Sequence, residues 1–201
     1  MSIIRLFFSA TLSADMIDKL DKSQSHYLTK VMRIKENEVF SLFNKDGEWE
    51  AKVLEISKNI VEFKTTKQLR QKENFKELWL AFSPIKSNFQ NFMIQKATEL
   101  GVTRFLPIIF DRTVVRKINK ERLEKIVIEA SEQSNRINVP IVEESQKLNN
   151  LLRDLFRNER EFFQNPILIF HFVHNLGLLI LIPFAHIHIV CRYQLQYNLQ
   201  P

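Results

Sequence analysis

The chain has 201 residues and a mass of 23.9 kDa, which allows one domain or two small ones with cores of their own. A formal net charge of +6 and a pI near 9.4 make nucleic acid or another anionic surface the first partner to consider, with an inert basic surface as the equal alternative. A single cysteine, Cys191, excludes an internal disulfide framework and favours a cytoplasmic protein.

The first 70 residues predict a small β-rich domain. Alternating apolar runs at 39–43 and 49–56 flank Asp46-Gly47, and this pair favours a hairpin because its turn needs a positive φ. A second turn at 57–59 and a third strand at 60–63 follow. The pattern therefore predicts an antiparallel barrel or sheet.

Three further segments complete this half of the chain. Residues 3–8 predict a strand, residues 26–33 a short helix, and the charged stretch 68–76 a linker. In the short helix we expect three apolar side chains inward and two basic ones outward, namely Leu28, Val31 and Met32 against Lys30 and Arg33.

Strands and helices alternate between residues 78 and 142. Apolar runs predict buried strands at 78–82, 104–109 and 139–142. The first helix has Ser87 as its expected cap and Gly101 just past its end, and the second is capped by Asn119. The expected inner stripes are Phe89, Phe92, Met93, Ala97 and Leu100 in the first, and Leu123, Ile126, Val127 and Ala130 in the second. This alternation predicts a parallel sheet covered on both faces.

Basic residues gather in the loops of this region. Ligands of open α/β sheets bind outside the carboxyl ends of the strands, and Arg112 and Arg116 follow such an end. A solvated basic loop is the alternative. Arg136, at the end of the second helix, has the alternative role of complementing the helix dipole.

The composition changes abruptly after about residue 160. Residues 1–160 hold 28 of the 29 Lys and Arg, and residues 162–190 hold no charged side chain except histidine. A membrane anchor, a buried strand and a product of a shifted reading frame are the three alternatives. The apolar stretch 167–182 has 16 residues, which is short for a spanning helix, and it is interrupted by two histidines and an asparagine. The pair His186 and His188, without a cysteine or carboxylate nearby, is a weak metal-ligand set.

Several short sequences together resemble one family. In the second half they are Lys86-Ser87-Asn88-Phe89, residues 95–102, Pro107, residues 111–115, residues 129–136 and Val139-Pro140. In the first half they are Arg5-Leu6-Phe7-Phe8, His26-Tyr27-Leu28 and Val31-Met32-Arg33. From about residue 3 to 145 the chain resembles the RsmE family, which methylates N3 of a uridine in 16S ribosomal RNA.

The resemblance implies an α+β chain of two domains. A PUA-like RNA-binding β-barrel is expected over 1–70 and a linker over 71–77, and the front of an α/β SPOUT methyltransferase domain, normally knotted, over 78–160. Residues 161–201 are then an apolar tail that leaves this domain incomplete. The family holds its donor, S-adenosylmethionine, in a Gly-Pro-Glu-Gly-Gly loop and a later Leu-Gly segment, and this sequence has neither.

The resemblance also implies partners and site residues. The partner is 16S ribosomal RNA in the small ribosomal subunit, and the family forms homodimers. The expected RNA-binding residues are Arg5, Lys30, Arg33, Arg112, Arg116 and Arg136. No catalytic base and no donor-binding residue can be assigned, so we expect weak donor binding and no methylation. The alternatives are an inactive RNA-binding fragment and a tail-anchored membrane protein.

Overall fold

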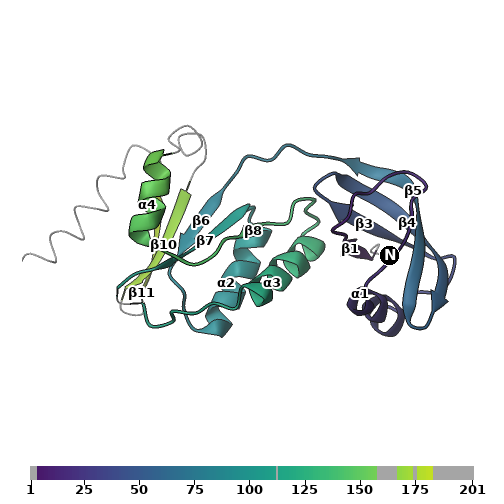
Figure 1. The fold of residues 1–201 in the computed structure, drawn as a ribbon, viewed down its shortest axis with the longest axis horizontal. Helices are drawn as coiled ribbons and strands as arrows, with labels where there is room; N and C mark the ends of the chain where they lie inside the picture. The colour runs from purple at the N-terminus through teal and green to yellow at the C-terminus, as the bar shows by residue number, and fades with distance from the viewer. Residues whose placement is uncertain (1–3, 112, 158–166, 174–175, 183–201) are drawn as a thin grey trace, which may run out of the picture. The chain divides into compact units, whose positions relative to one another are not determined.

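The computed structural model describes residues 4–111, 113–157, 167–173 and 176–182 (Figure 1). Its contacts divide the chain into two compact units. Unit 1 comprises Met1–Phe75 and Ile128–Val139, and unit 2 comprises Lys76–Val127 and Pro140–Pro201. The sequence predicted that residues 128–139 belong to the second half. Hydrogen bonds between these residues and the first strand group them with unit 1 instead.

Unit 1 is built on a five-stranded sheet of order β1-β3-β4-β5-β2. The strands are β1 (Arg5–Phe7), β2 (Ile17–Lys19), β3 (Val39–Asn44), β4 (Gly47–Ser57) and β5 (Ile60–Gln71). β1 runs parallel to β3, and the other neighbours are antiparallel. The sheet curls around a core of aliphatic and aromatic side chains, among them Phe40, Leu42, Val53 and Phe63.

Both turns expected in this unit are confirmed. Gly47 has φ +138, and a Cβ there would lie 2.5 Å from the carbonyl oxygen of Arg70, so only glycine fits the hairpin. Lys58 and Asn59 both have positive φ, 50 and 61, which is the geometry of a two-residue turn between twisted strands.

The helical segment before the hairpin differs from the prediction. It consists of α1 (Lys22–His26), capped by Asp21, and a π-turn η1 (Tyr27–Val31). Leu28 is fully buried as expected, whereas Val31 is 60% exposed and Met32 40%. The π-turn changes the angular spacing of the side chains, so the stripe drawn from a 3.6-residue period no longer faces the core.

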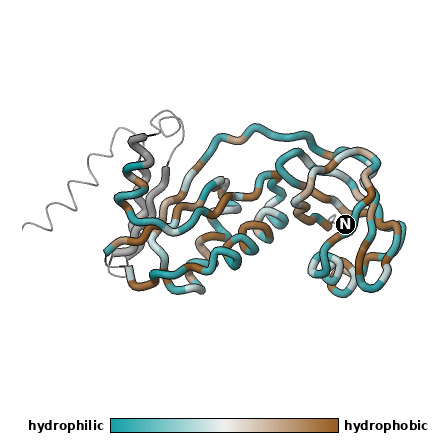
Figure 2. The backbone as a smooth tube through the Cα atoms, in the orientation of Figure 1, coloured by the Kyte–Doolittle hydropathy of each residue, from teal (hydrophilic) through white to brown (hydrophobic). Residues whose placement is uncertain are grey.

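The linker is shorter than predicted. β5 continues to Gln71, where Gly47 and Glu48 of β4 still pair with it, so residues 68–71 belong to the sheet. The segment after it, up to Leu78, has no regular structure and is largely hydrophilic (Figure 2).

Unit 2 is built on a mainly parallel sheet. Its main path has the order β11-β10-β6-β7-β8, and β9 also pairs with β7. The bounds are β6 (Trp79–Phe82), β7 (Arg104–Ile109), β8 (Ile141–Val142), β9 (Gln146–Lys147), β10 (Ile167–Val173) and β11 (Leu176–Ile182). β10, β6, β7 and β8 run parallel to one another, and β11 is antiparallel to β10. The strands predicted at 78–82 and 104–109 are confirmed.

Helices cover both faces of this sheet, as predicted. Leu148 and Leu151 of α4 (Leu148–Arg157) pack with Trp79, Leu106 and Ile108 on one face. Figure 1 shows α2 (Ser87–Glu99) on the other side. The third helix is α3 (Lys120–Gln133), and it has the expected cap, since Asn119 Oδ1 accepts the Arg122 backbone N–H at 3.0 Å. Leu123, Val127 and Ala130 are buried as predicted.

The inward face of α2 is not the one that the sequence pattern predicted. Gln90, Ile94 and Thr98 are buried, while Phe89, Phe92 and Leu100 are 68%, 62% and 82% exposed. Ser87 is the first helical residue and does not cap it, because the cap position is Lys86 and no side chain bonds there. Gly101 has φ +106 and ends the helix as expected.

Within the described part of the apolar segment, the strand alternative is correct. β10 extends the sheet beside β6, and β11 returns beside β10 as its antiparallel neighbour. The described helices include none that is long and apolar enough to cross a membrane. The rest of the region after residue 157 lies outside the described residues, and so does the expected knot.

Candidate nucleic-acid interface

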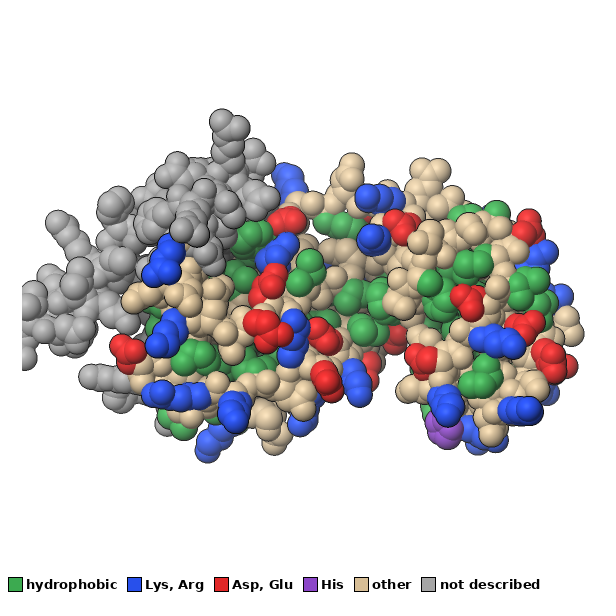
Figure 3. Space-filling model, viewed as in Figure 1, with side chains coloured by type: hydrophobic (Ala, Val, Ile, Leu, Met, Phe, Trp, Pro, Cys, Tyr) green, Lys and Arg blue, Asp and Glu red, His purple; other side chains and the backbone are tan. Residues whose placement is uncertain are grey.

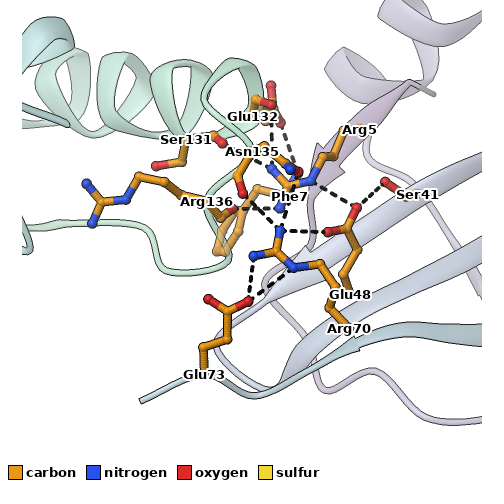
Figure 4. Close-up of polar contacts among 10 residues, drawn as sticks. All are labelled: Arg5, Phe7, Ser41, Glu48, Arg70, Glu73, Ser131, Glu132, Asn135 and Arg136. Carbon is orange, nitrogen blue, oxygen red and sulfur yellow. Dashed lines mark hydrogen bonds and ion pairs between the residues drawn. The ribbon is translucent and has the colours of Figure 1, made fainter. Parts of the chain in front are cut away.

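A buried group of polar contacts in unit 1 ties residues 128–139 to the β-sheet (Figure 4). Arg5 lies at its centre with a side chain only 9% exposed. Its Nε donates to Glu48 Oε1 at 2.9 Å, and its two Nη atoms donate to the carbonyl oxygens of Ser131 at 3.0 Å and Arg136 at 2.6 Å. The guanidinium also lies 3.8 Å from the centre of the Phe43 ring.

Glu48 balances this buried cation and also contacts a second one, Arg70. Glu48 also accepts the hydroxyl of Ser41 at 2.7 Å, and its second oxygen lies 3.5 Å from Arg70. Arg70 in turn donates to the carbonyl oxygen of Asn135 at 2.9 Å and to Glu73 at 2.6 Å. Burial lowers the pKa of Arg5 from its ordinary value, and Glu48 opposes that shift.

A third link joins the first strand to α3. The backbone N–H of Phe7 donates to Glu132 Oε1 at 2.9 Å. Burial raises the pKa of the Glu132 carboxyl above its ordinary value, and this hydrogen bond works against the rise. We call the set Arg5, Glu48, Arg70 and Glu132 the clasp.

The clasp gives Arg5 a structural role, and a direct RNA contact by Arg5 stays a prediction. Its three donor nitrogens are used by protein acceptors, so its guanidinium serves the fold of unit 1. Arg136 is also engaged, because its Nε and Nη2 donate to Asn138 Oδ1 at 3.1 and 3.0 Å, and burial lowers its pKa. A direct RNA contact by Arg136 stays a prediction.

Lys30 and Arg33 lie on the surface of unit 1, as the sequence predicted. Lys30 is exposed on η1. Arg33 is exposed just after η1 and has φ +58. Within the described residues neither side chain makes an ion pair, so both charges are available to a ligand.

The carboxyl ends of β6 and β7 are joined in unit 2 by a pair of buried hydroxyls. Ser83 Oγ, just past β6, lies 3.2 Å from Thr113 Oγ1 in the loop after β7. Thr113 Oγ1 also accepts the Phe110 N–H at 2.9 Å, which fixes the start of that loop. Arg116 is exposed and donates to the Asp111 carbonyl oxygen at 3.1 Å. Arg112 lies outside the described residues.

The glycine-rich donor loop that the family resemblance implies is absent after residue 160, and the residues of β10 do not fit such a loop. Glycine allows a backbone to approach a cofactor closely, whereas Phe170-His171-Phe172-Val173 holds none. The described backbone continues as strand to Val173 and pairs with β11. Residues 162–201 also hold no carboxylate. Among the described residues no cluster of His, Cys, Asp or Glu is arranged to hold a metal ion.

Comparison with known families gives two matches. Residues 20–66 match the RNA methyltransferase PUA domain, and residues 71–172 match the RNA methyltransferase domain. The second match reaches past residue 145, where the resemblance had been expected to end, and includes most of β10.

Curated relatives with the name ribosomal RNA small subunit methyltransferase E cover most of the chain. The protein of Rickettsia conorii is 36% identical over 177 residues, which are 84% of this chain and 72% of the relative. That of Buchnera aphidicola (from Acyrthosiphon pisum) is 28% identical over 82% of this chain and 68% of the relative.

Solved structures agree with these matches. The enzyme of the same name from Neisseria gonorrhoeae, bound to S-adenosylmethionine, has a TM-score of 0.68 and 29% identity over 75% of this chain and 64% of that one. A Legionella pneumophila methyltransferase with bound cofactor has a TM-score of 0.69 and 25% identity, over 77% and 67%. A PUA-like domain followed by an α/β methyltransferase domain of the SPOUT type places this chain in the ribosomal RNA small subunit methyltransferase E family.

Proposed function

We propose that this chain serves the reaction of its family, the S-adenosylmethionine-dependent methylation of small-subunit ribosomal RNA, with N3 of a uridine in 16S RNA as the acceptor. The observation that carries the proposal is the parallel sheet itself. β10, β6 and β7 are aligned so that their carboxyl ends share one edge, and ligands of such sheets bind there.

The chemistry demands positioning more than a strong base. N3 of uridine is an imide nitrogen and a weak nucleophile until it loses its proton, so holding it in line with the methyl group supplies much of the rate. A uridine in folded RNA must also leave its stack to be reached. The loop fixed by Thr113 and Ser83 holds Arg116 near this edge, where a cation can hold a phosphate.

The RNA-binding role rests on exposed cations in both units. We assign it to Lys30 and Arg33 on unit 1 and to Arg116 on unit 2, with Arg5, Arg112 and Arg136 kept as predictions. Lysine and arginine contacts with phosphate release counterions, so the affinity is expected to fall steeply as salt rises.

The residues after Phe170 favour a second candidate function, RNA binding without methyl transfer. The family's glycine-rich loop is replaced there by bulky side chains, and Gly177 is the one glycine after Gly101. We therefore expect donor binding weaker than the micromolar range.

Methyl transfer from labelled S-adenosylmethionine to small ribosomal subunits that lack the modification separates the two candidates. Incorporation that needs millimolar donor and falls with Arg116→Ala supports the family reaction. Binding of the same RNA with no incorporation at any donor concentration overturns methyl transfer and leaves the RNA-binding function.

A homodimer is also part of this proposal, because the family resemblance implies one and α2 offers a surface for it. Phe89, Phe92 and Leu100 form an exposed apolar stripe on that helix. Apolar side chains that gather in this way on a surface commonly mark an interface, and a second copy of the chain is the partner that we propose.

A further inference from the structure

Unit 1 carries a pocket on its surface. Of the residues expected to bind RNA, Lys30 lines it. Its volume is about 400 Å³, within the range in which pockets accept small ligands or parts of larger ones. Its lining residues are Lys22, His26, Lys30, Lys58, Asn59 and Ile60. The space-filling view shows lysine or arginine side chains beside a histidine at the edge of this unit (Figure 3).

The helical segment supplies one wall of the pocket. Lys22, His26 and Lys30 follow one another at intervals of four residues along α1 and η1, and all three face the pocket. The buried Ser25 fixes this segment, because its hydroxyl accepts the Val61 N–H at 3.1 Å and donates to the Leu20 carbonyl oxygen at 3.3 Å. The helix is thereby held against the start of β5.

The turn between β4 and β5 supplies the other wall. Lys58 and Asn59 occupy its two central positions with positive φ. Asparagine adopts this conformation readily, whereas lysine does so uncommonly. The turn conformation therefore does not explain why residue 58 is a lysine. Its charge lies opposite the basic face of the helix.

The charge of the pocket is not neutralised by its surroundings. No carboxylate lines it, and within the described residues Lys22, Lys30 and Lys58 make no ion pair. The nearby acidic groups are used elsewhere. Asp21 accepts the Gln24 N–H at 2.8 Å as the helix cap, and Glu62 pairs with Lys19 at 3.2 Å.

We propose that this pocket binds a backbone phosphate of the RNA substrate and its ribose. The inference rests on the proposed function, and it adds a defined site on the PUA-like domain, whose family match over residues 20–66 contains all six lining residues. Flexible lysines bind phosphates whatever the base sequence of the RNA. Such contacts fix the position of the RNA on the protein and do not distinguish its bases. His26 and Asn59 add hydrogen-bonding groups within reach of a 2′-hydroxyl.

The test compares two triple variants of the full chain that lose the same charge. One is Lys22→Ala, Lys30→Ala and Lys58→Ala. The control is Lys45→Ala, Lys67→Ala and Lys72→Ala, three exposed lysines of the same unit outside the pocket. Binding to labelled small-subunit RNA is measured between 50 and 200 mM salt. The pocket variant is expected to bind about tenfold more weakly, with a log–log salt slope lower by about 1 to 2 than wild type.

A second measurement does not depend on the variants. In the wild-type chain, micromolar RNA is expected to protect the three pocket lysines from acetylation more strongly than the three control lysines. Inorganic phosphate at the same phosphate concentration is expected to give no such protection. Equal protection by inorganic phosphate identifies a small-anion site and overturns the assignment to RNA.

The outcomes separate this inference from the proposed function. If the wild-type chain binds RNA and both triple variants lose the same affinity, the pocket is not the RNA site, and the proposed function is unaffected. Absence of RNA binding by the wild-type chain overturns both. If the wild-type chain transfers methyl groups to RNA and the pocket variant binds RNA as tightly as wild type, the proposed function stands and the pocket has no part in it.

Discussion

Unit 1 and the far edge of the sheet in unit 2 differ in how well their residues match what the family resemblance implies. In unit 1 the buried clasp holds residues 128–139 against the sheet. At the far edge, β10 lies beside β6 and is followed by the antiparallel β11, and the glycine-rich donor loop of the family is absent from the sequence. Because two of the proposed RNA-binding residues, Lys30 and Arg33, lie in unit 1, we expect RNA binding to persist even where donor binding is weak.

Removing the central cation of the clasp should have the largest effect. Arg5→Ala leaves Glu48, whose side chain is 7% exposed, without its closer cationic partner, since Arg70 lies 3.5 Å away. Breaking a buried pair from one side costs about 3 to 5 kcal/mol, so the free energy of unfolding should fall by about that amount in urea titrations. Lys19→Ala breaks the exposed pair with Glu62 and should cost less than about 1 kcal/mol. Equal losses would show that the clasp does not hold unit 1.

A charge placed in the apolar stripe of α2 tests the proposed dimer. Phe92→Glu should weaken self-association about tenfold or more, because a buried aromatic contact is replaced by a carboxylate that must lose its water. Phe75→Glu makes the same change on an exposed residue of unit 1 and serves as the control. Sedimentation equilibrium measures both. A monomeric wild-type chain at all concentrations would remove the dimer from the proposal.

A smaller effect is expected from pH. The pKa of Glu132 is raised in the folded chain, so folding takes up protons and is favoured at low pH. Its stabilising contribution should decline as pH rises from the ordinary glutamate value, about 4.3, through the raised one. Since Glu132 is partly exposed, the change should be less than about 1 kcal/mol. Denaturant titrations of wild type and Glu132→Gln should therefore diverge in favour of Gln as pH increases, and parallel curves would contradict this.

Local sequence signals predicted most of the secondary structure. The Asp46-Gly47 hairpin, the cap at Asn119 and the strand at 104–109 depend on neighbouring residues alone, and all three were correct. The face of α2 was wrong because polar residues can be buried when they find local partners. Gln90 accepts the Ile85 N–H and Thr98 donates to the Ile94 carbonyl oxygen, so neither is left unsatisfied.

The site was less predictable because its contacts join distant parts of the chain. Arg5 had the residue type of a phosphate ligand, but its acceptors come from residues 131 and 136. The spacing of Lys22, His26 and Lys30 was visible in the sequence. Its meaning depends on Lys58, which only the fold brings to the same pocket.

The most direct test of the difference between the two regions is a pair of titrations on one preparation of the chain. Small-subunit RNA is added to one sample and S-adenosylmethionine to the other, and binding heat is measured in both. Salt-sensitive RNA binding is expected, together with donor binding that does not saturate in the micromolar range. Micromolar binding of the donor at one site per chain would contradict this account, because it would show that the residues after Phe170 complete the donor site.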